Sequence, residues 1–584
     1  MRPILDPRDG DIEDDASSTK RRSFLSLAGS LLAEISLPKL AVAWMLLIGL
    51  PGLLLGAVPL LVSIWLDSVV SKAANMFTEL WPAVLLAPLA AVGWFVGRPL
   101  LRLAETSFWS LNALLVQPSY VAFREGLRHL AEQLLASGKR DVRRGSVRAA
   151  TAAAAGVAVF TLNLGVIVLV WPASRWIVSL PDLGSLHGWL PIVVANSVVL
   201  ISGYLAIAAM IWGCADMMMP QPRDLDSFFA GAAEGRTWRV AHLSDIHTVG
   251  ERYGFRVESG RAGPRGNERL GRALARLDEV HAVHPVDVVL ITGDLTDAGR
   301  SAEWAEFFDA LAPYPQLAER VIALPGNHDV NVVDRASPAR LELPTSPTKR
   351  LRQARTISAL GMLQGNRLQL VERQASRLGP SLVEALKPHV DDMVAFADRG
   401  SVTLSRSVAA LWTSIFPLVL PPEADDGLGI VVLNSNAETH FSFTNALGLV
   451  SADQVRALDI VFRQYPRACW IVALHHHIIE YPQAAKALSE RIGTTLINGS
   501  WFVRKLQRLT DRVVLMHGHR HVDWIGQCGG VLIISAPSPV MNGTDCVHTY
   551  FYVHTLAAGI DGRLRLFEPE RIVVAGAPTP TAHN

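Results

Sequence analysis

The chain has 584 residues, of which 18% are charged and 50% are hydrophobic, and its mean hydropathy is +0.26. Ordinary soluble domains carry about 25% charged residues, so this composition excludes a disordered chain and argues against a wholly soluble one. The formal net charge of +1 gives no indication of a nucleic-acid partner. The four cysteines form no CxxC pair, which excludes a disulfide scaffold and favours a reducing compartment.

The apolar excess lies before residue 220, in four long uncharged runs. A membrane-spanning helix needs about 20 apolar residues, and a charge at its centre costs about 2.5–3.5 kcal/mol on insertion scales. We therefore predict a membrane domain at residues 40–215 with about four transmembrane helices. The alternative, a large buried helical core, rarely contains four such runs. The runs are Leu40–Leu66, Leu80–Gly97, Ala149–Ser174 and Leu183–Ala215.

The orientation of this domain follows from its loops. The segment at 102–148 holds eight Lys and Arg residues, whereas the loops at 67–79 and 175–182 hold one each. The basic loop is therefore expected to be cytoplasmic, which puts the N-terminal tail (1–39) and the C-terminal region on the cytoplasmic side of the cell (inner) membrane. Arg21-Arg22 resembles a twin-arginine export signal, which would reverse this orientation. Glu34 and Lys39 interrupt the apolar segment that such a signal needs.

Residues 216–236 contain Pro, Gly and Ala in a pattern typical of a linker. The region from 237 to 575 then reads as an α/β domain, in which apolar runs predict strands buried on both faces of a sheet. Helical stretches lie between several of them, for example at Glu268–Val283 and Ala302–Leu311. The predicted strands are Trp238–Leu243, Val286–Thr292, Val321–Leu324, Gly429–Leu433, Trp470–Leu474 and Val513–Met516.

A long segment at about 331–428 separates the third strand from the fourth. It shows helical periodicity over Ala354–Leu386 and an apolar stretch at Val408–Leu420. We interpret it as a helical insertion. A lid over the site, a surface that rests on the membrane or the basic loop, and a plain helical insertion all agree with this pattern.

Each predicted strand ends at polar residues, and layered α/β folds bind ligands at the carboxyl ends of strands. Oxygen and imidazole donors suit Mn, Fe or Zn better than a thiolate site does, and seven donors exceed a single tetrahedral zinc site. They suit two divalent ions that share a carboxylate and promote in-line displacement at phosphorus. The seven donors are Asp245, His247, Asp294, Asn327, His476, His519 and His521.

The order of these motifs resembles the calcineurin-like metallophosphoesterase superfamily over about residues 240–538. The matching motifs are Asp245-x-His247, Gly293-Asp294, Gly326-Asn327-His328-Asp329, His475-His476-His477 and Gly518-His519-x-His521. The resemblance implies a four-layer α/β/β/α sandwich with a dinuclear site at the strand ends.

The resemblance also implies a division of the ligands. Asp245, His247 and His521 would hold one metal ion. Asn327, His476 and His519 would hold the other, with Asp294 as the bridge. Ile478 stands where the family has a proline, which leaves His475 as an alternative to His476.

The same resemblance implies catalytic roles. A metal-bridging hydroxide would be the nucleophile, His328 would face the leaving-group oxygen, and Asp329 would orient His328. Four arginines in the loop after Asp-x-His are candidates to contact an anionic substrate through bidentate pairs, Arg252 and Arg256 above all. A solvated surface loop explains them slightly better. The four are Arg252, Arg256, Arg261 and Arg265.

These observations predict a membrane-anchored phosphoesterase that depends on two divalent metal ions and hydrolyses a phosphoester, by preference a phosphodiester. A lipid-linked phosphate or pyrophosphate is the alternative substrate, because of the predicted spans. A non-catalytic sensor on the same fold would be expected to lack Asp294, Asn327 or His328, and all three are present. The expected partners are a phosphoester substrate and the lipid bilayer, with no nucleic acid. The native metals and the oligomeric state stay open.

Overall fold

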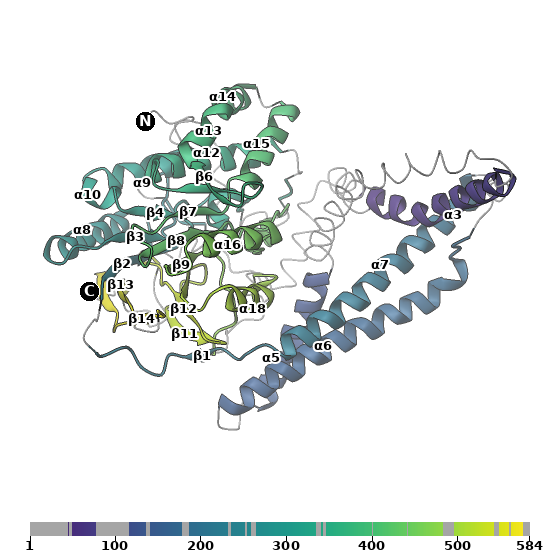
Figure 1. The fold of residues 1–584 in the computed structure, drawn as a ribbon, viewed down its shortest axis with the longest axis horizontal. Coiled ribbons are helices and arrows are strands. Elements are labelled where there is room, and N and C mark those ends of the chain that lie inside the picture. Colours follow the sequence, from purple (N-terminus) through teal and green to yellow (C-terminus); the bar gives the residue numbers. More distant parts are fainter. Residues whose placement is uncertain are drawn as a thin grey trace, which may run out of the picture. The chain divides into compact units, whose positions relative to one another are not determined.

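The computed structural model describes residues 45, 49–76, 116–135, 141–177, 186–231, 235–251, 254–257, 264–334, 340–342, 346–399, 401–440, 442–482, 496–541, 548–559 and 562–575. The chain divides near residue 220 into two compact units, an N-terminal helical unit and a C-terminal α/β unit (Figure 1).

The helical unit is built around α6 and α7, which pack along each other. A Cβ atom placed on Gly156 of α6 would lie 2.9 Å from the carbonyl oxygen of Ala209, and one on Gly213 of α7 would lie 3.0 Å from that of Ala152. Only small residues permit this approach of two backbones, a packing that is common between membrane helices. The helices of the unit are α3 (Leu50–Met76), α5 (Gln117–Leu135), α6 (Asp141–Val170) and α7 (Leu186–Met217), with a 3₁₀ turn η3 (Trp171–Ala173) after α6.

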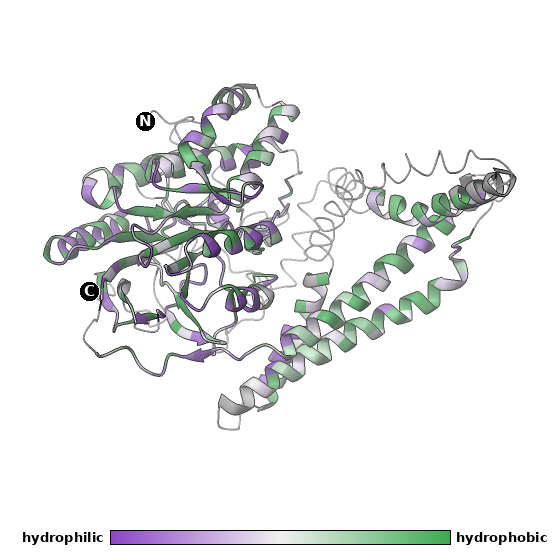
Figure 2. Ribbon diagram, in the orientation of Figure 1, coloured by the Kyte–Doolittle hydropathy of each residue, from purple (hydrophilic) through white to green (hydrophobic). Residues whose placement is uncertain are grey.

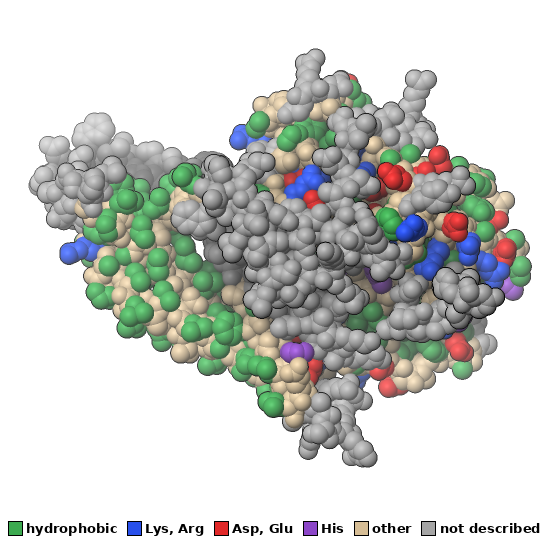
Figure 3. All heavy atoms as spheres, turned by 180° about the vertical axis from the view of Figure 1, so that it is seen from behind, with side chains coloured by type: hydrophobic (Ala, Val, Ile, Leu, Met, Phe, Trp, Pro, Cys, Tyr) green, Lys and Arg blue, Asp and Glu red, His purple; other side chains and the backbone are tan. Residues whose placement is uncertain are grey.

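Within the described part of the chain, two helical segments are long and apolar enough to cross a membrane, Gly145–Ala173 and Gly188–Met217. They coincide with the third and fourth predicted spans, and Figures 2 and 3 show the hydrophobic residues along them. At the first predicted span, α3 contains a shorter apolar stretch, Leu50–Ile64. The second predicted span and the tail at 1–39 lie outside the described residues. A multi-pass domain of four spans therefore stays a prediction.

The α/β unit contains two mixed sheets. In the six-stranded sheet the order is β14-β13-β2-β3-β4, with β15 also paired to β13, and the β2, β3 and β4 strands are parallel. Its strands are β2 (Thr237–Leu243), β3 (Val288–Ile291), β4 (Val321–Ala323), β13 (Thr549–Ala558), β14 (Leu564–Leu566) and β15 (Glu570–Ala575).

The second sheet has nine strands in the order β1-β11-β12-β10-β9-β8-β7-β5-β6, with β8, β9, β10 and β12 parallel. The six predicted strands correspond to β2, β3, β4, β8, β9 and β10, which confirms the predicted α/β domain. The strands of this sheet are β1 (Arg223–Asp224), β5 (Gln369–Glu372), β6 (Arg377–Ser381), β7 (Leu418–Leu420), β8 (Leu428–Val432), β9 (Cys469–Ala473), β10 (Val513–His517), β11 (Trp524–Cys528) and β12 (Val531–Ser535).

Helices flank these sheets, and one buried core includes residues of both, such as Leu290 of β3 and Ile471 of β9. The helix predicted at Glu268–Val283 is α8, and the one predicted at Ala302–Leu311 is α9, which begins at Ser301. The other helices are α10 (Pro315–Ala318), α11 (Asn327–Val330), α12 (Pro347–Gln364), α13 (Leu382–Leu386), α14 (Val390–Arg399), α15 (Val402–Ser414), α16 (Ala452–Gln464) and α18 (Gly499–Leu509), with 3₁₀ turns η6 (Lys387–His389) and η7 (Ser442–Thr444).

The segment at 331–428 is helical only in part. Between α12 and α13 the chain forms the β5–β6 hairpin, and after α15 it forms β7, so that three strands extend the nine-stranded sheet beyond β8. The helical periodicity at Ala354–Leu386 therefore spans a helix, a hairpin and a second helix. The insertion is part of the sheet, and its buried residues, such as Leu360 and Trp412, belong to the same core as the rest of the α/β unit.

The segment predicted as a linker is ordered in part along the α/β unit. Its β1 strand pairs with the edge strand β11, and Trp524 donates to Asp224 at 2.8 Å. Phe229 packs edge-on against Phe567 with ring centroids 5.3 Å apart. Residues 220–231 therefore form a strap that covers an exposed sheet edge.

Candidate metal centre

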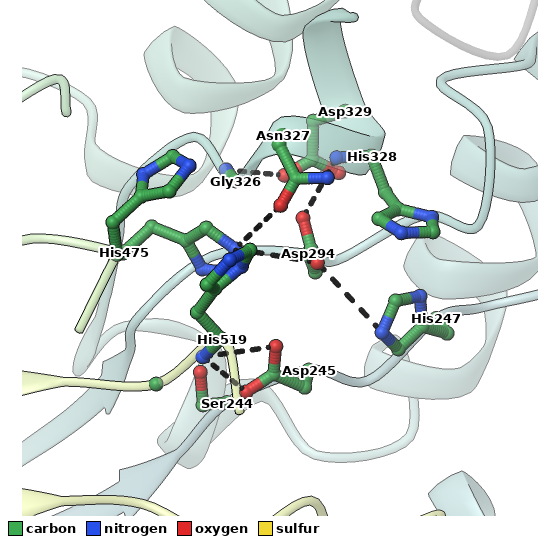
Figure 4. Close-up of polar contacts among 12 residues, drawn as sticks. Ser244, Asp245, His247, Asp294, Gly326, Asn327, His328, Asp329, His475 and His519 are labelled. Atoms are coloured by element: carbon green, nitrogen blue, oxygen red, sulfur yellow. Dashed lines mark hydrogen bonds and ion pairs between the residues drawn. The ribbon is translucent and has the colours of Figure 1, made fainter. Parts of the chain in front are cut away.

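The polar residues at the strand ends converge in the α/β unit (Figure 4). Asp245 and His247 follow β2, Asp294 follows β3, and Asn327 begins α11 after β4. From the second sheet, the histidines at 475–477 follow β9, and His519 and His521 follow β10. Because the strands within each group are parallel, their carboxyl ends lie at one edge, and the side chains after them can meet.

The backbone of this site is unusual. Five of its donors adopt a left-handed conformation, which a residue with a Cβ atom rarely takes. Among the described residues, Ser376 is the only other non-glycine residue with a positive φ. Such conformations collect at functional sites, where the surroundings must enforce them. The five are Asp245 (φ 54°), His247 (46°), Asp294 (51°), His519 (77°) and His521 (53°).

One group of donors surrounds His475. Its Nε2 atom lies 3.0 Å from Asn327 Oδ1, 3.3 Å from Asp294 Oδ2 and 3.0 Å from His519 Nδ1. Its Nδ1 atom lies 2.8 Å from the carbonyl oxygen of Thr292, which only accepts, so Nδ1 carries a proton. In the neutral ring the lone pair of Nε2 then faces two oxygen acceptors. A cation between these atoms resolves the conflict, and a histidine that donates its second nitrogen to a carbonyl is typical of metal ligands.

The electrostatics of His475 agree with this interpretation. Burial alone would lower its pKa, but the adjacent Asp294 carboxylate raises the pKa of His475 to about 9. In the absence of metal a proton therefore occupies the position that a divalent ion would take. Burial and the neighbouring His476 hold the pKa of His519 well below its usual range, which keeps that imidazole in the neutral form that binds metal.

The second group consists of Asp245, His247 and His521. His247 Nε2 lies 3.3 Å from His521 Nε2, and His521 Nε2 lies 3.5 Å from Asp245 Oδ1. Asp245 also accepts the backbone N–H of His519 at 2.9 Å, which ties the two sheets together at the site. Burial and the neighbouring His328 lower the pKa of His247. This group again offers one carboxylate and two imidazoles as donors.

Asp294 lies between the two groups. Its Oδ1 atom accepts the backbone N–H of His328 at 2.8 Å, while Oδ2 is 3.7 Å from His247 Nε2 and 3.3 Å from His475 Nε2. Burial would raise the pKa of Asp294, but His475 and the other imidazoles around it hold it well below its usual range. Gly326 permits this position, because a Cβ atom there would lie 2.1 Å from Asp294 Oδ1. Asp294 thus lies close to imidazole donors of both groups, and the donor set fits divalent metal ions.

Among the three adjacent histidines, the structure brings His475 to the donors and leaves His476 aside. The Nδ1 atom of His476 lies 2.9 Å from Ser435 Oγ, and the ring packs on His519 with centroids 4.5 Å apart. The groups that could hold a metal include Asp294, His475 and His519, and His476 is not among them. The geometry thus favours His475, which the presence of Ile478 in place of the family's proline had left as an alternative.

His328 lies beside His247, with the two rings edge-on and 4.5 Å between centroids. Its Nδ1 atom lies 2.7 Å from the carbonyl oxygen of Asp297, and 4.0 Å from the carboxylate of the same residue. Asp297 also lies 3.4 Å from His247 Nδ1. Asp297 is thus a buried carboxylate that contacts both histidines, and its place three residues after Asp294 was the only sequence signal for it.

Asp329 has a different place from the one expected. Its carboxylate accepts the backbone N–H of Thr296 at 2.9 Å, the Thr296 hydroxyl at 2.7 Å and the backbone N–H of Gly326 at 2.8 Å. Burial and the Asp294 charge raise the pKa of Asp329 to about 6. These contacts hold the loops after β3 and β4 together, whereas the oxygen that faces His328 Nδ1 at 2.7 Å is the carbonyl oxygen of Asp297.

Of the four candidate substrate arginines, the structure describes Arg256 and Arg265, and the contacts of both lie within their own loop. Arg256 is fully buried and donates to the carbonyl oxygens of Pro264 and Gly266, both at 2.8 Å. Burial lowers its pKa to about 10. Arg265 stacks on Phe255 at 4.3 Å, and Arg252 and Arg261 lie outside the described residues. Arg256 therefore closes its own loop.

Comparison with known proteins gives a family match over part of the α/β unit. Residues 239–372 match the family model of the calcineurin-like phosphoesterases. Among solved structures, the chain is similar to a dimetal phosphatase from Danio rerio, at 13% identity and a TM-score of 0.32 over 58% of this chain and 99% of that one. It is also similar to a putative 5'-nucleotidase from Staphylococcus aureus in complex with alpha-ketoglutarate, at 12% identity and a TM-score of 0.31 over 59% of this chain and 56% of that one. No curated protein matches the sequence.

Proposed function

We propose that this chain is a membrane-anchored phosphodiesterase with a dinuclear metal centre, and the match of residues 239–372 to the calcineurin-like phosphoesterase family supports the hydrolase class. The observation that carries the proposal is the shared carboxylate: Asp294 Oδ2 lies within 3.7 Å of an imidazole nitrogen from each donor group. In this proposal Asp245, His247 and His521 hold one divalent ion, and Asn327, His475 and His519 hold the other.

Two divalent ions in such a site supply Lewis-acid charge and an activated water for in-line displacement at phosphorus. The residues of this chain hold the ions in place, and His328 supplies one proton. Asp297 accepts from His328 Nδ1, so Nε2 is the nitrogen that exchanges a proton with the substrate. His328 then protonates the leaving alkoxide as a general acid, which typically accelerates a reaction by about 10²–10⁴-fold.

The anchor is proposed from the helical unit. The α6 helix exposes apolar side chains along most of its apolar length, which favours contact with lipid over a role as a buried core helix. Its small-residue contact with α7 also supports a membrane helix pair. With the basic segment at 102–148 on the cytoplasmic side, the catalytic unit would lie at the cytoplasmic face of the cell membrane. The apolar side chains that α6 exposes include Val157, Leu162, Leu164, Val166, Val168 and Leu169.

The proposal is tested with the full-length protein in detergent, loaded with Mn²⁺ and offered soluble phosphodiesters, phosphomonoesters and lipid-linked phosphates. We expect Mn²⁺-dependent hydrolysis of a diester and close to two metal equivalents per chain. If a lipid-linked phosphate or pyrophosphate is hydrolysed in preference to the diesters, that compound is the substrate and the phosphodiester proposal is wrong. Absence of both bound metal and hydrolysis would refute the proposed enzymatic function. A C-terminal reporter that is active only outside the cytoplasm would overturn the orientation.

A further inference from the structure

The α12 helix of the insertion carries cationic side chains into the interior of the protein. It packs against β4 and against α11, the four-residue helix that contains His328. Charged residues are almost never fully buried unless they are paired. The partners of these side chains should therefore show what the helix does. Its buried cations are Lys349, Arg350, Arg352 and Arg355.

Arg352 and Thr356 lie one turn apart on α12 and reach two successive carbonyl groups of α11. Arg352 Nε donates to the carbonyl oxygen of Val330 at 3.3 Å. The Thr356 hydroxyl lies 3.3 Å from the carbonyl oxygen of Asp329 and 2.9 Å from that of Arg352, so that it links the two segments. The last carbonyl groups of a helix have no partner within the helix and need one from elsewhere. Arg352 also forms a buried ion pair with Glu342, which balances its charge and fixes its direction. The two side chains thus cap the helical turn that carries His328.

The same arginine touches the loop that holds the ring of His328. Gly299 has φ +70°, and a Cβ atom there would lie 2.8 Å from Arg352 Cδ and 2.5 Å from the carbonyl oxygen of Asp329. Two residues before Gly299 is Asp297, whose carbonyl oxygen faces His328 Nδ1 at 2.7 Å. The stem of Arg352 is therefore packed where the loop after β3 meets the turn after β4.

We propose that Arg352 is a positioning residue for His328, and that α12 thereby gives the insertion a role in catalysis. The guanidinium fixes the backbone of α11, its stem fixes the loop of Asp297, and together they set the direction of the imidazole toward the leaving-group oxygen. The inference rests on the proposed function, because it assumes that His328 protonates that oxygen. A small misplacement of a catalytic group can cost about 10²-fold in rate.

The test compares two diesters that differ only in their leaving group, methyl 4-nitrophenyl phosphate and methyl phenyl phosphate. The nitrophenolate leaves with little help from an acid, whereas the more basic phenolate needs protonation. With the Mn²⁺-loaded full-length protein, His328→Ala should slow the phenyl ester much more than the nitrophenyl ester. Arg352→Met should show the same selective loss, by about tenfold to 10²-fold on the phenyl ester, with unchanged metal content.

Two further variants separate positioning from general damage. Arg352→Lys keeps the charge but loses the fork of donors, so its loss on the phenyl ester should be intermediate. The double variant with His328→Ala should be no slower than His328→Ala alone, because the two residues act as one unit. Arg350→Met is the matched control. Arg350 is a buried arginine of the same helix that bonds Gln353 and Glu438, and both of its rates should stay near wild type.

Equal losses of Arg352→Met on both esters, or a further loss in the double variant, would overturn the inference. If Arg352→Met does not fold, Thr356→Val removes the hydroxyl that lies between the carbonyl oxygens of Asp329 and Arg352, and the same selective loss is expected from it. An unselective effect of Thr356→Val, or none, would also overturn the inference. A wild-type protein that hydrolyses neither ester with Mn²⁺ would refute the proposed function instead.

Discussion

The three adjacent histidines after β9 provide the sharpest test of the metal centre, because their side chains have nearly the same sequence context. The Nε2 atom of His475 lies 3.0–3.3 Å from donor atoms of Asn327, Asp294 and His519. His476 faces Ser435 at 2.9 Å, and His477 faces Glu480 at 3.4 Å. Replacing each by alanine in turn should therefore affect metal binding very unequally.

The magnitude follows from the number of donors removed. The group around His475 has four donors, and His475→Ala leaves three of them. Loss of a residue that only supports a ligand costs about 10–100-fold in metal affinity, so loss of a direct donor should cost at least about 10²-fold, or about 2.8 kcal/mol. His476→Ala should stay within the range of a supporting residue, since its ring packs on His519. His477→Ala should change the affinity least.

The assay is metal content after dialysis at fixed free Mn²⁺, followed by a calorimetric titration of each variant. We expect about two equivalents for wild type and His477→Ala, and about one for His475→Ala. Circular dichroism would check that each variant is folded. A His476→Ala variant that loses one metal ion while His475→Ala keeps both would refute the geometric assignment and restore the ligand that the sequence favoured.

The remaining predictions concern other parts of the protein. Asp294→Asn should lower the affinity for both ions together, which the same titration would show as two weakened sites. A chain that begins at residue 236 should melt below one that begins at 219, because it lacks the β1 pairing and the Trp524–Asp224 hydrogen bond, each such bond contributing about 0.5–1.5 kcal/mol. Burial and Asp297 raise the pKa of Glu303 to about 8 from 4.5, so the folded state holds its proton longer than the unfolded state, and stability should fall as pH rises through that window. Glu303→Gln should flatten this fall in urea unfolding at several pH values, and an unchanged slope would contradict it. Chelation of metal should lower the melting temperature of wild type more than that of Asp294→Asn.

The strands could be predicted from the sequence for one physical reason. Strands buried on both faces are continuous apolar runs, and each run stops at polar residues, so that β2, β3, β4, β8, β9 and β10 were visible without a structure. The choice between His475 and His476 was not visible, because it depends on which side of the chain faces the site after the strand ends. Asp297 escaped notice because a single carboxylate in a loop carries no pattern.

The insertion and the strap show the limits of periodicity. The β5–β6 hairpin is short and half-exposed. Its alternation of apolar and polar residues is too brief to stand out between the helices α12 and α13. The β1 strand has two residues, and it forms because β11 offers an unpaired edge. Tertiary pairing of this kind overrides local propensity. A sequence that lacks a periodic signal can therefore still be ordered, provided that a partner edge is available.

The strained backbone explains why so many hydrogen bonds surround the donors. Each non-glycine residue in a left-handed conformation costs about 1–3 kcal/mol, so the five donors together cost about 5–15 kcal/mol. This equals the whole net stability of a typical domain, and the surrounding structure must offset it. Asp329 contributes by tying the loops after β3 and β4, Asp245 by accepting the N–H of His519, and Arg352 by capping α11. An ion held at one hundred times its dissociation constant would add about 2.7 kcal/mol. Two such ions would together add about 5.4 kcal/mol, which reaches only the lower end of this range. The elements outside the family motifs, α12 among them, therefore contribute to keeping the donors in place, above all before metal binds.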